Sequence, residues 1–327
     1  MRSLLVLLLA LLCCACSTQD EEGGTGVIYV SNQGSNSLAR FSRATTAQGD
    51  VLPQVSLRGQ LTRLNSPGFL TYDPLADRMI VPNGDNSILF FDGIHGLAEN
   101  APPLRFLSGL SSQLNRPTQV VLDLRQDLLY VANSGGGNVL VFANASSLQG
   151  TVAPIRVLSG PATRLSSVAS IALDSENDRL WVADSTANAI LVYEGASSLN
   201  GAVPPSRVIS GNNTRLSSPG FLLLDGQHLW VSCNQSILRF QGSVDLQGDV
   251  APVASISGSA TGLVRPAQLR RRADNDELYV ADTGASALLV FERSSSANGA
   301  PPPRRRIFGV RPGLTQVTGL VLDLDRN

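Results

Sequence analysis

The feature that most constrains the fold is an internal repeat of about 50 residues that runs through the chain after residue 26. Six segments share an apolar strand ending near a Val, a polar turn and a second apolar strand, as in LLYVANSGGGNVLVF and ELYVADTGASALLVF. A repeat of this period predicts an array of similar units. Successive marker valines are 51, 50, 51, 49 and 49 residues apart, at Val30, Val81, Val131, Val182, Val231 and Val280.

Each unit carries four short runs of β-branched and aromatic residues separated by clusters of turn-forming residues. In the third unit these runs are TQVVLD (118–123), LLYVAN (128–133), NVLVFA (138–143) and IRVLSG (155–160). Such runs predict strands, and four strands per unit are typical of a propeller blade, which buries both faces only by stacking on its neighbours. The predicted fold class is all-β, a six-bladed β-propeller of four-stranded antiparallel blades over residues 27–327.

The two ends of the repeat region predict how the ring closes. The first unit has no innermost strand before Val27, and the chain finishes with TGLVLDLD, from Thr318, with no second strand after it. We expect the C-terminal strand to pair into the N-terminal blade. This pairing would remove an open sheet edge, which is a site of aggregation.

The repeat resembles a known family. The repeat is similar to the NHL repeat in its order of features: Pro, an apolar run ending in Asp, LYVAD or LYVAN, a polar turn and an LVF strand. The pattern is clearest over residues 117–142 and 266–291. The connections QGTVAPIRVLSG and NGAVPPSRVISG resemble those of bacterial NHL-type propeller lipoproteins. The resemblance implies a six-bladed propeller and says little about function, because propellers change function by changing loops.

The N-terminus predicts export. MRSLLVLLLALLCCACSTQ has one Arg, an apolar run from Leu4 to Leu12 and then small residues, which is typical of a secretory signal. It resembles a bacterial lipoprotein signal over residues 1–16, with lipidation at Cys16 and a tether over 17–26; cleavage without lipid is the alternative. Ser17 resembles the pattern sent to the outer membrane. We therefore expect an envelope lipoprotein, periplasmic or surface-facing and anchored to the membrane by its N-terminal lipid.

Composition narrows the partners and the redox chemistry. The formal net charge is −1, so bulk electrostatics do not indicate a nucleic-acid partner. Three of the four Cys lie in the leader, which leaves Cys233 without a disulfide partner in the folded part. We expect Cys233 to be a small buried residue. An Arg also precedes four outermost strands and is expected to pair with an acid of a neighbouring unit: Arg105, Arg156, Arg207 and Arg305.

Short polar residues recur where the second strand of each unit ends, at one mouth of the expected channel. The expected role of these side chains is to hydrogen-bond the backbone of the adjoining turn. The alternative is a ligand-binding ring whose oxygens hold a ligand or Ca²⁺, which takes 6 to 8 oxygen ligands. The residues are Asn32, Asn83, Asn133, Asp184 and Asp282, with Cys233 at the sixth place.

Catalytic motifs are scarce. The sequence lacks a G-x-S-x-G elbow, an H-E-x-x-H motif and a P-loop. No Glu stands where lactonase-like propellers have one beside their calcium. His95 and His228 are too few for a three-His zinc site, and both are expected at the surface. No catalytic or metal-binding residue and no cofactor is predicted, apart from the calcium alternative.

The most irregular place in the repeat is the arginine triplet of the sixth unit. Arg270 and Arg271 stand where other innermost strands are apolar, and Arg272 replaces the Asp that ends those strands. An unpaired buried charge is costly. The side chains are expected to pair with Asp274, Asp276 or Asp323; alternatively they form a cationic site that binds an anion.

These observations favour a non-catalytic, monomeric propeller that binds an envelope protein or a polysaccharide. Two alternatives remain open: a metal-dependent propeller hydrolase or lyase, lactonase-like, with its site at the channel mouth, and a purely structural envelope component.

Overall fold

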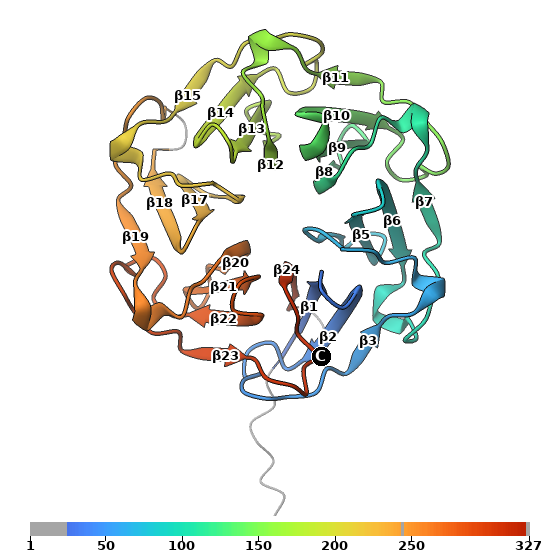
Figure 1. The fold of residues 1–327 in the computed structure, drawn as a ribbon, viewed down its shortest axis with the longest axis vertical. Coiled ribbons are helices and arrows are strands. Elements are labelled where there is room, and N and C mark those ends of the chain that lie inside the picture. The colour runs from blue at the N-terminus through green and yellow to red at the C-terminus, as the bar shows by residue number, and fades with distance from the viewer. Residues whose placement is uncertain (1–24, 243–244, 325–327) are drawn as a thin grey trace, which may run out of the picture.

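The computed structural model describes residues 25–242 and 245–324, which form a ring of six four-stranded antiparallel sheets (Figure 1). The predicted fold class is confirmed. We number the blades from the one that contains the described N-terminus. No helix in the described residues is long and apolar enough to cross a membrane.

Each blade has an innermost, a second, a third and an outermost strand. The innermost strands of blades 1 to 6 are β24 (Val317–Asp323), β4 (Thr71–Asp73), β8 (Pro117–Asp123), β12 (Val168–Asp174), β16 (Phe221–Asp225) and β20 (Pro266–Arg272). The second strands are β1 (Val27–Asn32), β5 (Arg78–Asn83), β9 (Leu128–Asn133), β13 (Arg179–Asp184), β17 (His228–Cys233) and β21 (Glu277–Asp282).

The outer half of each blade follows the same order. The third strands are β2 (Ser37–Ser42), β6 (Ser87–Asp92), β10 (Asn138–Ala143), β14 (Ala189–Glu194), β18 (Ser236–Gln241) and β22 (Ala287–Phe291). The outermost strands are β3 (Val55–Leu57), β7 (Arg105–Leu107), β11 (Arg156–Leu158), β15 (Arg207–Ile209), β19 (Ala254–Ser257) and β23 (Arg305–Ile307).

The hydrophobic core lies between neighbouring blades. The buried apolar residues form clusters that each combine two adjacent blades, such as Tyr130 of β9 with Leu180 and Val182 of β13. The second strands are almost completely buried because a blade covers each of their faces. The period-2 alternation of a half-exposed sheet is therefore absent, and both faces of the strand are apolar.

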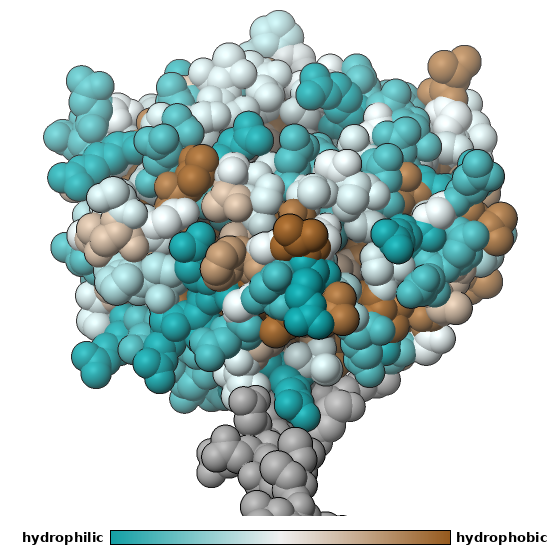
Figure 2. All heavy atoms as spheres, turned by 60° about the horizontal axis from the view of Figure 1, so that its bottom comes forward, coloured by the Kyte–Doolittle hydropathy of each residue, from teal (hydrophilic) through white to brown (hydrophobic). Residues whose placement is uncertain are grey.

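Outside the blade interfaces, apolar side chains are scattered. The most exposed ones in the described residues are Leu110, Val310 and Leu75. Figure 2 shows one side of the ring, where brown residues lie singly or in small groups among polar ones. Single exposed apolar residues are ordinary on soluble proteins.

The ring closes as the sequence predicts. β24 pairs antiparallel with β1 from Val27 opposite Asp323 to Asn32 opposite Val317 (Figure 1). The blade that contains the described N-terminus therefore takes its innermost strand from the other end of the chain.

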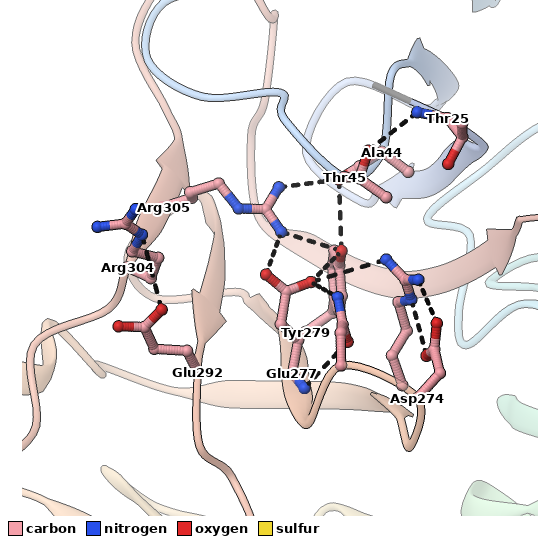
Figure 3. A network of polar contacts seen from close by, with 11 residues as sticks. Thr25, Ala44, Thr45, Asp274, Glu277, Tyr279, Glu292, Arg304 and Arg305 are labelled. Atoms are coloured by element: carbon pink, nitrogen blue, oxygen red, sulfur yellow. Dashed lines mark hydrogen bonds and ion pairs between the residues drawn. The ribbon is translucent and has the colours of Figure 1, made fainter. Parts of the chain in front are cut away.

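A polar cluster adds a second link between blades 6 and 1 (Figure 3). The Arg305 guanidinium donates to the Ala44 carbonyl at 2.9 Å and to the Glu277 carboxylate at 2.7 Å. The Tyr279 hydroxyl donates to Glu277 at 2.8 Å. Burial raises the pKa of Glu277, but the hydrogen bonds from Arg305 and Tyr279 outweigh it and leave that pKa below its usual value. Arg305 thus pairs with an acid of its own blade, not of a neighbouring one as the sequence predicts, and it reaches the next blade through the Ala44 carbonyl.

The channel is closed at mid-height. Phe69, two residues before β4 of blade 2, and Phe221, the first residue of β16 in blade 5, approach each other from opposite sides of the ring. The two rings meet edge to face with centroids 5.1 Å apart. At the same level the buried Gln268 amide bonds Leu70 and Leu320 of two other blades, each at 2.8 Å. These contacts divide the channel into two chambers.

Truncation after Gln316 tests the closure. It removes β24 and with it the burial of Val317, Leu320 and Val321, each worth about 1.5–3 kcal/mol. We expect a free energy of unfolding lower by more than about 5 kcal/mol and loss of a single cooperative transition in calorimetry. Truncation after Leu324, which keeps the strand, is the control. A chain ending at Gln316 with an unchanged melting temperature would contradict this role.

Candidate functional site

The recurring strand-end residues are bound to protein backbone. The side-chain oxygens of Asn83, Asn133, Asp184 and Asp282 each accept a backbone N–H from the loop before the innermost strand, at 2.6–2.9 Å. All four, and Asn32, are at most 1% exposed.

Burial and these hydrogen bonds favour the turn-holding role over ligand binding for Asn83, Asn133, Asp184 and Asp282. Asn32 is equally buried, but its side-chain oxygen accepts no hydrogen bond from the described residues. In residues 25–242 and 245–324, no group of three or more His, Cys, Asp or Glu side chains is arranged to hold a metal ion.

Cys233 is buried as expected. Burial raises the pKa of its thiol to about 11, although a backbone hydrogen bond from Ser217 acts in the opposite direction. The sulfur is thus protonated at neutral pH, and a thiol is a much weaker nucleophile than a thiolate.

Two members of the arginine triplet are neutralised by acids. Arg271 contacts Asp225 at 2.6 Å and Asp276 at 2.8 Å. Arg272 pairs with Asp274 at 2.5 Å and approaches Glu277 at 4.0 Å, at the edge of the cluster in Figure 3. An anion site built on all three arginines is therefore corrected, because the cations of Arg271 and Arg272 already have carboxylate partners.

Arg270 differs from its neighbours. Its guanidinium contacts the Leu269 carbonyl at 3.3 Å and the Leu70 carbonyl at 3.5 Å, and lies 5.9 Å from the centre of the Phe221 ring. No carboxylate of the described chain contacts it. Burial lowers its pKa to about 10, so the side chain is still a cation at neutral pH. The side chain is only partly exposed, where it lines the channel, and a partly desolvated charge without a counterion interacts strongly with an incoming anion.

Arg270 lies in what we call the lower chamber, on the side of the Phe69–Phe221 contact where the first and second strands are joined. At the same level the other blades contribute only neutral residues, namely Thr71, Val121, Ala172, Leu223 and Val321. Two cavities of about 300 and 420 Å³ open here, and both are lined by Arg270 and Tyr72.

A second polar cluster reaches the lower chamber from blades 1 and 2. His95 lies between two carboxylates: its Nδ1 contacts Asp77, and its Nε2 lies 2.8 Å from Asp323. The Tyr72 hydroxyl donates to Asp77 at 3.0 Å and to Asp323 at 3.4 Å. The His95 side chain is only 17% exposed, so the expectation of a surface histidine is wrong. Its partner Asp323 comes from the closing strand.

The 420 Å³ cavity brings these groups together, because Arg270, Tyr72 and Asp323 all line it. Histidines and carboxylates are the side chains that most often act as general bases, and here Asp323 lies beside His95. A guanidinium is suited to the negative charge that develops on an ester carbonyl oxygen during attack by water. The chamber therefore combines a base, a hydroxyl donor and a cation in an otherwise mainly apolar cavity, which is the usual composition of a small-molecule site.

Sequence comparison points to one family. The family model described as "Lactonase, 7-bladed beta-propeller" matches residues 52–300. No curated protein matches the sequence. The matching model is not that of the NHL repeat, and its description gives seven blades where this chain has six four-stranded sheets.

Solved structures share the fold. A nidogen/laminin complex aligns with a TM-score of 0.64 and 14% identity over 93% of this chain and 100% of that one. A putative 6-phosphogluconolactonase from Bacteroides fragilis aligns with a TM-score of 0.60 and 13% identity, over 94% of this chain and 99% of that one. The WD40 propeller domain of Doa1 aligns with a TM-score of 0.55 and 11% identity, over 88% of this chain and 80% of that one. At these identities the likeness concerns the fold alone.

Matched replacements separate Arg270 from Arg271. Arg270→Leu copies the residue at the same place in blade 5 and removes a desolvated cation without a carboxylate partner, so we expect the free energy of unfolding to hold or rise by about 1–3 kcal/mol. Arg271→Leu leaves Asp225 and Asp276 without their cation and should lower it by about 1–3 kcal/mol. Urea denaturation measures both. A strong loss of stability in Arg270→Leu would mean that Arg270 has a counterion in the folded protein, and would contradict its assignment as a cation without a carboxylate partner.

The ion pair of Arg271 also predicts a pH effect. Burial raises the pKa of Asp276, but hydrogen bonds from Ser295, Arg271 and Ser294 lower it to about 2. A depressed folded-state pKa stabilises the protein above the unfolded value of 3.8 and loses that effect as the pH falls toward 2. We expect the free energy of unfolding of wild type to be higher than that of Asp276→Asn by about 1–2 kcal/mol at pH 6, a figure reduced because solvent screens the partly exposed pair. A difference in unfolding free energy that stays constant down to pH 2 would contradict the assignment.

Proposed function

The chain belongs to the lactonase β-propeller family, and we propose that it hydrolyses a small cyclic ester in the lower chamber. The observation that carries the proposal is the cavity of about 420 Å³ that Arg270, Tyr72 and Asp323 line together. Family membership also supports a lactonase over the non-catalytic scaffold.

The chemistry uses groups of the chain itself. A water molecule gives its proton to Asp323, whose carboxylate is held by His95, and the water oxygen attacks the ester carbonyl carbon. The negative charge that forms on the carbonyl oxygen is stabilised by Arg270. When the ring C–O bond breaks, the leaving oxygen takes the proton back from Asp323, and the product is the open hydroxy acid.

Tyr72 and Asp77 have positioning roles. The Tyr72 hydroxyl lies within hydrogen-bonding distance of both carboxylates and gives its one proton to either of them, and Asp77 accepts a contact from the other ring nitrogen of His95. A histidine held on both sides keeps a fixed orientation toward Asp323, as oriented bases do in other hydrolytic sites. The mainly apolar wall around Arg270 excludes water and strengthens its attraction for the developing charge.

The cellular setting of this reaction rests on the leader sequence. Cys16, the expected lipidation site, and the signal segment 1–16 lie outside the described residues. We propose that the enzyme is exported to the cell envelope and anchored there. Blocking of lipoprotein processing with globomycin should cause an unprocessed precursor to accumulate, whereas Cys16→Ser should remove palmitate labelling; unchanged palmitate labelling of that variant would rule out Cys16 as the anchor.

Lactone hydrolysis tests the function. The purified wild type is assayed against γ-butyrolactone, δ-valerolactone and glucono-δ-lactone by titration of the acid released. We expect Arg270→Leu to lower kcat/KM about 100-fold or more, since loss of an oxyanion-stabilising group costs that much, while its stability is kept. Asp323→Asn should lower kcat by a similar factor.

The matched control is Arg304→Leu, the same chemical change at a guanidinium that is 65% exposed on the rim. We expect its kcat/KM to equal that of wild type. If wild type opens none of these lactones, or if Arg270→Leu and Arg304→Leu have the same activity, the hydrolase proposal is lost and the binding scaffold becomes the better account.

A further inference from the structure

A second chamber lies on the other side of the Phe69–Phe221 contact. We call it the upper chamber; it has a volume of about 540 Å³, within the range of about 300–1,000 Å³ of small-molecule sites. Phe69 lines it, whereas Phe221 lines the lower chamber. The contact between these two rings separates the chambers at this point.

The lining surface of the upper chamber is mainly apolar, and its polar groups are almost all uncharged. In five of the six blades the residue that follows the buried strand end lines this chamber with an amide or a hydroxyl; in blade 2 that residue is Gly84. The lining residues of this kind are Gln33, Ser134, Ser185, Asn234 and Thr283. No Asp, Glu or His is among the residues that line the chamber, and its single charged lining residue, Arg265, is exposed.

Two of the hydroxyl groups that line the chamber give their protons to backbone carbonyls. Thr283 donates to the Val317 carbonyl at 2.9 Å, and Thr318 donates to the Gln316 carbonyl at 3.0 Å. Their oxygens therefore keep lone pairs that accept hydrogen bonds. The amides of Gln33 and Asn234 supply both donors and acceptors.

The floor of the chamber is apolar. Phe69, Ala169 and Ala267 line it together with Pro266. The chamber thus offers many neutral hydrogen-bonding groups around the side and an aromatic ring at the base. A ligand that matches it carries several hydroxyl groups on its edge and an apolar C–H face, and has no net charge. Neutral saccharides have this combination.

We propose that the upper chamber binds a neutral mono- or disaccharide, independently of ester hydrolysis in the lower chamber. A charged ligand is disfavoured, because an anion meets only the exposed Arg265 and a cation meets no carboxylate among the lining residues. The saccharide is bound by hydrogen bonds from Gln33 and Asn234 at the mouth and by contact of its C–H face with Phe69 at the floor.

Calorimetric titration of the full-length protein tests this. The probes are glucose, galactose, maltose, cellobiose and lactose, with gluconate and glucosamine as charged counterparts. We expect at least one neutral sugar to bind with a Kd on the order of 1 mM or tighter, which corresponds to about −4 kcal/mol. The charged counterparts should bind at least about tenfold more weakly.

Variants locate the binding. The double change Gln33→Ala with Asn234→Ala should weaken binding of that sugar at least about tenfold. Gln227→Ala removes an exposed amide at the opposite end of the ring and should leave the Kd unchanged. Ser185→Ala gives a second, less disruptive replacement in the wall and should weaken binding by about threefold.

Two results overturn the proposal: no binding of any neutral sugar up to concentrations of about 20 mM, or binding that the double variant leaves intact. Neither depends on lactone hydrolysis. A protein that opens lactones and binds no sugar keeps the proposed function and loses this site.

Discussion

The pairing of β24 with β1 is the interaction on which the rest of the structure depends. Each blade buries its two faces only against neighbours, so no blade is stable without the one on either side. A ring of such blades has no natural end, and the seam must be as strong as the other interfaces. Here it is joined by a seven-residue strand and, further out, by the Arg305–Glu277–Tyr279 cluster that reaches Ala44.

The seam also builds the candidate site. Asp323 reaches the lower chamber because it ends the closing strand, and it lies 2.8 Å from a ring nitrogen of His95 in the connection of the second blade. Arg270 comes from the last complete blade, on the other side of the same strand. The groups of the proposed site thus come together only when the ring is closed, so the proposed activity would depend on the same contacts as folding.

The repeat made the architecture predictable, since spacing of the marker valines and the missing first strand are properties of the sequence alone. The pairing of Arg272 with Asp274 and of Arg271 with Asp276 was predictable for a similar reason, because these partners are neighbours in the chain. His95 was not: it belongs to a connection that the other blades do not share, and Asp323 is far away in sequence. The Phe69–Phe221 contact joins blades three apart, which becomes visible only once the number of blades is known.

The closed mid-height of the channel has a consequence for traffic through the molecule. A propeller with an open channel lets small molecules pass along its axis, whereas in this one the Phe69–Phe221 contact lies between an upper and a lower chamber. In the proposed hydrolysis, the lactone would enter the chamber of Arg270, and the hydroxy acid would leave it, on the same side of the Phe69–Phe221 contact. Release of the new carboxylate past the cation of Arg270 would then be the step most sensitive to salt, because salt screens their attraction.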